Sequence, residues 1–186
     1  MAGEAALILR TLEQHLEGPA HVRLFGGAAV ILGYGATRAT EDADLLQDDS
    51  EVQLMIEQAN IGEALAKTNK ELEPRGLYIS HVWGPEQQIL GPRWREDCRP
   101  VPAFSGRLRL SVLGPMDLIV SKLARLDDVD IEDARYLIAT ECLTVESIRA
   151  ALELAIVPAP LAEIFKETRP RLEALLASLS KPLPPS

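Results

Sequence analysis

Two aspartates spaced two residues apart, Asp42 and Asp44, are the strongest candidates for chemistry in this chain. In an extended strand, residues i and i+2 point to the same face and lie about 7 Å apart, so both carboxylates would meet at one spot. Magnesium prefers oxygen ligands and usually binds one or two carboxylates together with substrate phosphates. The spacing therefore predicts a metal site formed by Asp42 and Asp44.

A glycine pair precedes these acids by about fifteen residues and predicts a sharp turn. The apolar residues 22–25 end at Gly26 and Gly27, and residues 28–35 are apolar and compatible with a helix. This order predicts a strand, a tight turn and a helix. Glycine lets the backbone lie close to a ligand, and the unpaired amides at a helix start attract anions such as phosphate. Turn and acids together predict a site for a nucleoside triphosphate (NTP) with bound Mg²⁺.

Each feature also has a simpler explanation. Acids are common in this part of the chain, so Asp42 and Asp44 also fit a solvated strand face. Gly26 and Gly27 also fit a turn that only requires a positive φ. The chemical interpretation depends on the order of the two features, a glycine turn followed by paired acids.

Composition places the chain among globular proteins with one sizeable core. Of the 186 residues, 47% are hydrophobic and 25% are charged, which is ordinary for a folded domain. No apolar run approaches the roughly 20 residues that span a bilayer, and the first residues lack a basic leader. We therefore expect a cytoplasmic protein without a membrane partner.

Charge and cysteine content disfavour a broad nucleic-acid surface and a zinc site. A net charge of -9 disfavours a broad nucleic-acid surface, although five arginines between residues 93 and 109 form a local basic stretch. These arginines also fit solvated loop charges. Cys98 and Cys142 lie far apart without a Cys/His pattern, so they predict structural thiols and not a zinc site.

Periodicity along the chain predicts an α+β fold with a mixed β-sheet flanked by helices. We expect strands at residues 22–25, around Asp42 and Asp44, at 76–84 and at 106–114, with a long ordered loop over residues 85–102. Helices are expected at residues 4–16, 28–35 and 50–72, the last capped by Ser50 and broken near Gly62. Further helices are expected from Pro115 and at residues 131–140, 144–155 and 161–179. The predicted organisation is an α/β core at residues 1–114, a helical C-terminal region at 115–180 and a tail at 181–186.

With these patterns in hand, residues 25–46 resemble the minimal nucleotidyltransferase superfamily, which has a polymerase-beta-like palm. Residues 113–138 look like the helical lysine-and-aspartate region of its AbiEii-like branch. Residues 92–99 resemble a tryptophan-arginine loop of small uncharacterised bacterial proteins related to that branch. The resemblance covers roughly residues 20–140.

This resemblance implies roles for the candidate residues. Gly26 and Gly27 would hold the triphosphate, and Asp42 and Asp44 would bind Mg²⁺ and serve catalysis. Lys122 would approach the phosphates or stabilise charge on the leaving group. The remaining implied roles are supporting ones: Arg38 and Thr40 brace the loop before the metal strand, and Asp130 and Asp133 belong to the helical motif.

The resemblance further implies transfer of a nucleotide from an NTP to a hydroxyl acceptor, which could be a protein side chain, a small molecule or an RNA end. The chain departs from the family pattern in one respect. Many active members carry a third carboxylate on a later strand, but the predicted strands at residues 76–84 and 106–114 contain no acid. Two alternatives to a nucleotidyltransferase outside a toxin–antitoxin pair follow. The chain could be the toxin of a toxin–antitoxin pair, with a cognate antitoxin as partner, or a catalytically degenerate fold that binds nucleotide or protein.

Overall fold

A computed structural model of the chain describes residues 3–123 and 125–179. The chain divides into two compact units. The first comprises residues 1–85 and 94–114, and the second comprises residues 86–93 and 115–186. The predicted tail at residues 181–186 lies outside the described residues.

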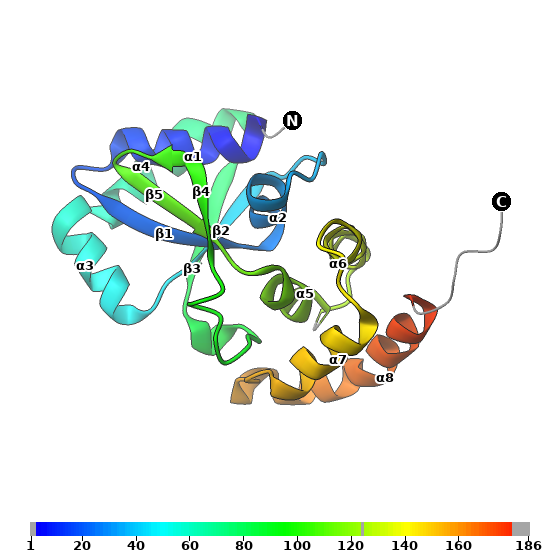
Figure 1. The fold of residues 1–186 in the computed structure, drawn as a ribbon. Helices are drawn as coiled ribbons and strands as arrows, with labels where there is room; N and C mark the ends of the chain where they lie inside the picture. Colours follow the sequence, from blue (N-terminus) through cyan, green and yellow to red (C-terminus); the bar gives the residue numbers. More distant parts are fainter. Residues whose placement is uncertain (1–2, 124, 180–186) are drawn as a thin grey trace. The chain divides into compact units, whose positions relative to one another are not determined.

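The first unit is built on a five-stranded sheet with the strand order β3-β2-β1-β5-β4 (Figure 1). Its strands are β1 (Ala20–Phe25), β2 (Asp42–Leu46), β3 (Tyr78–Trp83), β4 (Arg99–Ser105) and β5 (Leu108–Val112). Strand β1 runs antiparallel to β2 and parallel to β5, while β3 is parallel to β2 and β4 is antiparallel to β5. This mixed sheet with flanking helices confirms the predicted α+β class.

One face of the sheet forms the core of this unit. The helices are α1 (Gly3–His15), α2 (Gly26–Tyr34), α3 (Asp49–Ala59) and α4 (Ile61–Leu72), followed by the short 3-10 turn η1 (Glu73–Arg75). Helix α1 packs against α4, and both lie on the same side of the sheet (Figure 1). Val22 and Leu24 of β1, like Ala43 and Leu45 of β2, are fully buried. Because strand side chains alternate, His21 and Arg23 share the opposite face with Asp42 and Asp44.

The predicted loop over residues 85–102 is wrong in its last four residues, which belong to a strand. A 3-10 turn, η2 (Pro85–Gln87), opens the segment, but β4 begins at Arg99. Pro100 and Pro102 lie within this strand although proline cannot donate to a sheet ladder. Strand β4 tolerates them because it lies at the edge of the sheet.

The predicted helix over residues 50–72 is two helices, as its glycine-containing break suggested. Asn60 adopts a left-handed conformation with φ 50° between α3 and α4. The predicted cap at Ser50 is wrong, because the N-cap is Asp48. Its carboxylate accepts the amide of Glu51 at 3.0 Å, and the Glu51 carboxylate accepts the amide of Asp48 at 3.1 Å. The two residues form a capping box.

The second unit is helical. Its elements are α5 (Pro115–Leu123), α6 (Asp128–Thr140), α7 (Val145–Leu154), the 3-10 turn η3 (Ala159–Leu161) and the long α8 (Ala162–Leu179). Thr144 caps α7 by accepting the amide of Ser147 at 3.1 Å. Residues 86–93 belong to this unit: Leu90 forms a β-bridge with Ile156, and the Gly91 amide donates to Asp117 at 2.6 Å.

Candidate active site

The glycine turn and Asp44 lie together at the end of β1. Gly26 begins α2 directly after the strand and has φ +68°, a conformation that side chains rarely adopt. A Cβ at this position would lie 2.6 Å from Oδ2 of Asp44, so the carboxylate occupies the space that a side chain would fill. The strand register explains this contact, because Phe25 pairs with Asp44 across β1 and β2.

Arg38 lies against the second glycine. A Cβ on Gly27 would be 2.4 Å from Nη2 of Arg38, and Nη1 of the same guanidinium donates to the carbonyl of Ala39 at 2.9 Å. A cation therefore sits beside the first turn of α2, where backbone amides and the helix dipole already favour an anion. The arrangement suits binding of a phosphate.

Asp42 is held by its own loop. The hydroxyl of Thr40 donates to Oδ1 of Asp42 at 3.0 Å and to the Asp42 carbonyl at 3.2 Å. Asp42 and Asp44 are half-buried, whereas Ala43 between them is fully buried. The two carboxylates therefore project from the same face of β2.

Asp44 is held by the neighbouring strand. The hydroxyl of Ser80 and the indole N–H of Trp83 both donate to its Oδ1, the latter at 3.3 Å. Neither Ser80 nor Trp83 was predicted at the site from the sequence. The only sequence signal was the aromatic and β-branched composition that predicted β3, and composition does not reveal which strand β3 pairs with.

Two carboxylates, those of Asp42 and Asp44, are the candidate metal ligands at this site. Strands β3 and β5 carry no Asp or Glu, and no cluster of three or more His, Cys, Asp or Glu side chains occurs in the described part of the chain. Two carboxylates on one face beside a phosphate-compatible turn fit Mg²⁺, which usually completes its coordination with phosphate oxygens and water.

Arg95, Arg99 and Arg107 of the predicted basic stretch have contacts within the first unit. Trp94 is 4% exposed, and its ring contacts the guanidinium groups of Arg23 at 5.6 Å and Arg95 at 4.3 Å. Arg23 pairs with Glu51 at 2.5 Å, and Arg95 pairs with Asp48 at 3.1 Å. Arg95 of the basic stretch therefore contacts Trp94 and Asp48, while Arg23, which precedes the stretch in the sequence, lies on the sheet face of the two carboxylates.

Two pKa values in this neighbourhood are shifted. Burial lowers the pKa of His21 below 6.5, and the nearby charges of Arg23 and Arg109 act in the same direction. The hydrogen bond from the Ser50 hydroxyl is the largest cause that lowers the pKa of Asp48 below 3.8. At neutral pH these shifts favour an uncharged imidazole and an ionised capping carboxylate.

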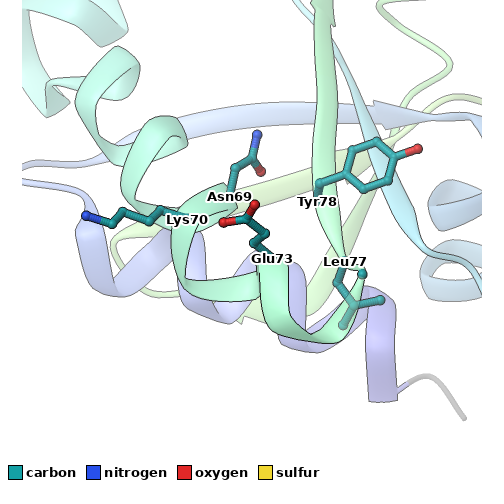
Figure 2. A pocket seen from close by; sticks show the side chains of 6 residues that line it. Asn69, Lys70, Glu73, Leu77 and Tyr78 are labelled. Atoms are coloured by element: carbon teal, nitrogen blue, oxygen red, sulfur yellow. The ribbon is translucent and has the colours of Figure 1, made fainter.

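A hollow of about 470 Å³ lies beside the start of β3 (Figure 2). Its lining residues come from α4, η1 and β3, namely Asn69, Lys70, Glu73, Gly76, Leu77 and Tyr78. The amide of Asn69 bonds both the N–H and the carbonyl of Ile79, at 2.7 and 3.0 Å. This contact occupies backbone groups of the edge strand, and Tyr78 pairs in register with Asp42.

Lys122 lies in the second unit and is 2% exposed. Its ammonium group contacts Asp130 Oδ1 at 2.9 Å and Asp133 Oδ2 at 2.7 Å, both on α6. Arg125 also pairs with Asp130, at 3.0 Å. The structure thus joins Lys122 to the two aspartates of the helical motif, and its role at the phosphates stays a prediction.

Comparison with known families agrees with this arrangement. A family model described as nucleotidyltransferase of unknown function (DUF6036) matches residues 4–156. The chain belongs to this family. The match includes the glycine turn, both carboxylates of β2 and Lys122, so the predicted nucleotidyltransferase resemblance is confirmed at the level of this family. No curated protein and no solved structure matches the chain. Within the described residues of this nucleotidyltransferase family member, no helix is long and apolar enough to span a membrane.

Proposed function

We propose that this chain is a cytoplasmic, metal-dependent nucleotidyltransferase that moves a nucleotide from an NTP to a hydroxyl acceptor. The observation that carries the proposal is the contact between Asp44 and Gly26: the carboxylate lies against the backbone of a helix start. Asp42 projects from the same strand face, and Arg38 lies against Gly27. Anion-binding and cation-binding groups therefore meet at one turn.

In this proposal the positively polarised groups bind the triphosphate and the carboxylates bind the metal. The amides at Gly26 and Gly27, with the guanidinium of Arg38, bind the triphosphate, and Thr40 holds Asp42. Asp42 and Asp44 would hold Mg²⁺. When bound, Mg²⁺ would neutralise charge on the phosphate oxygens and orient the triphosphate.

The proposed reaction is an in-line displacement at the α-phosphorus. The acceptor oxygen forms a bond to that phosphorus and releases its proton to solvent water, and the bond to the bridging oxygen of the β-phosphate breaks. Pyrophosphate leaves with the bonding electrons, and the nucleoside monophosphate stays on the acceptor. The protein contributes mainly by positioning the triphosphate and stabilising its charge.

The test is transfer of radiolabel from an α-labelled NTP mixture to protein, small-molecule or RNA acceptors in a cell lysate. Asp42→Asn and Asp44→Asn should each lower transfer at least about 100-fold, because each removes a charged metal ligand while keeping the side-chain volume. Glu41→Gln, a change of an exposed acid in the same loop, should retain activity. Transfer that persists in both asparagine variants would refute the assignment.

We further propose that the chain belongs to the AbiEii-like branch and acts as the toxin of a toxin–antitoxin pair. The support is the resemblance of residues 113–138 to the lysine-and-aspartate region of that branch. Induced expression should then arrest growth, the Asp44→Asn variant should not, and a protein encoded beside it should relieve the arrest. If cells continue to grow while they express the wild-type chain, the toxin role is rejected, but the proposed nucleotidyl transfer is not.

A second candidate is a catalytically degenerate member that binds nucleotide or a partner protein. The observation that favours it is the lack of any acid on β3 and β5. Thermal stabilisation by NTP and Mg²⁺ without incorporation of label into any acceptor would support this alternative.

A further inference from the structure

Strand β3 contains a β-bulge directly opposite Asp44. Ala43 pairs with Ile79 but Asp44 pairs with His81, so Ser80 is an extra residue on β3. A bulge places two residues opposite one, and it can re-aim a side chain that would otherwise follow the regular alternation. Here Ser80 is aimed at the carboxylate of Asp44.

Two neutral donors from β3 reach the same oxygen of Asp44. The Ser80 hydroxyl and the Trp83 indole N–H both bond Oδ1, whereas Oδ2 is the oxygen that faces Gly26. Hydrogen bonds to one carboxylate oxygen fix the rotation of the whole group. Because these donors are uncharged, they orient the carboxylate without forming an ion pair with it.

Aromatic contacts hold the indole of Trp83 in turn. Its ring meets the ring of Phe25 edge-on, with centroids 6.2 Å apart and an interplanar angle of 89°. His81 contacts the same indole at 4.8 Å. Phe25 is 3% exposed and immediately precedes Gly26, so the residue that begins the glycine turn also orients the donor to Asp44.

We propose that Ser80 and Trp83 are positioning residues for the metal-binding carboxylate of Asp44. They hold Oδ2 toward the glycine turn, where the metal would meet the triphosphate. This inference rests on the proposed function, because it assigns a ligand role to Asp44. It also assigns a task to β3, a strand that contributes no acid to the site.

The test measures metal binding directly. Free Mn²⁺ is counted by electron paramagnetic resonance during titration of the full chain, with an equimolar mixture of the four α,β-methylene ribonucleoside triphosphates present, and the Mn²⁺ that the triphosphates bind in a protein-free titration is subtracted. Ser80→Ala and Trp83→Phe should each weaken Mn²⁺ binding about 10-fold, a typical effect of losing a partner of a metal ligand. Phenylalanine keeps an aromatic ring at position 83 and removes only the N–H donor.

Two controls separate positioning from a general structural effect. Ser80→Thr keeps the hydroxyl and should restore binding to within about 2-fold of the wild type, since threonine is well suited to a strand. Ser111→Ala removes another hydroxyl of the same sheet, one that bonds His21 at 3.0 Å, and should leave Mn²⁺ binding unchanged. Thermal unfolding of each variant shows that the fold is retained.

The outcomes distinguish this inference from the proposed function. If Asp44→Asn loses Mn²⁺ but Ser80→Ala and Trp83→Phe bind like the wild type, the positioning role is overturned and the metal site stands. If wild type and Asp44→Asn bind Mn²⁺ equally, both the metal site and the positioning role are overturned.

Discussion

The two units each contain a pair of aspartates, and the pairs have opposite surroundings. Asp42 and Asp44 in the sheet unit are half-buried and accept hydrogen bonds from the neutral groups of Thr40, Ser80 and Trp83. Asp130 and Asp133 in the helical unit are buried, and both contact the ammonium group of Lys122.

This difference indicates a different task for each pair. A buried carboxylate must be neutralised nearby, and the helical pair meets this need within its own unit. The sheet pair is only half-buried, and neutral donors orient both of its carboxylates. We therefore expect the sheet pair to serve binding and the helical pair to serve stability.

The largest effect should follow Lys122→Met. It removes the ammonium between Asp130 and Asp133 and leaves buried charge uncompensated, which costs about 3–5 kcal/mol. Urea unfolding should detect the loss. Lys67→Met, which breaks the exposed pair with Glu63, should produce no measurable change. Equal stability of the two variants would contradict the assignment of the helical pair to stability.

Next comes Gly26→Ala, with Gly76→Ala as a matched control. The two glycines have nearly equal φ, +68° and +67°, but a Cβ at Gly76 meets nothing within 4 Å. The free energy of unfolding of both variants should fall by about 1–2 kcal/mol, because alanine is strained in the left-handed conformation. Only Gly26→Ala should also impair Mn²⁺ and triphosphate binding, because its Cβ displaces the Asp44 carboxylate. Unimpaired binding in this variant would argue against the turn as part of the site.

A smaller effect is expected at Asp48, an aspartate of the sheet unit with a structural task. Asp48→Ala removes the N-cap of α3 and should cost about 1 kcal/mol without changing Mn²⁺ binding. Since folding lowers the pKa of Asp48, its stabilisation is present above pH 3.8 and is lost as the pH falls through its folded value. Unfolding of wild type and variant at pH 7 and at acidic pH measures this difference. A loss of Mn²⁺ binding in Asp48→Ala would contradict the assignment of a purely structural role to Asp48.

The smallest effect concerns His21, on the same sheet face as the carboxylates. Folding lowers its pKa, so the unfolded chain binds more protons near pH 6.5. Its contribution to stability is complete well above pH 6.5 and declines as the pH falls from there toward the folded value. His21→Gln should flatten this part of the curve of unfolding free energy against pH. An unchanged slope would show that another group titrates in this range.

The local part of the site was predictable from the sequence, and the long-range part was not. Strand alternation placed Asp42 and Asp44 on one face, and the glycines located the turn after β1. The contact of Ser80 with Asp44 joins residues 36 positions apart and depends on a bulge that no pattern reveals. The apolar residues of the predicted helix 50–72 indicated a buried side that includes Leu54 and Ile56, but these two are 50% and 49% exposed, and α3 buries Met55 and Ala59 instead.

The most direct test of the central claim is a crystal structure with Mn²⁺ and an α,β-methylene ribonucleoside triphosphate. We predict an anomalous manganese peak within coordination distance of carboxylate oxygens of both Asp42 and Asp44, with phosphate oxygens against Gly26 and Gly27. A manganese and triphosphate complex bound elsewhere, with neither carboxylate as a ligand, would contradict it.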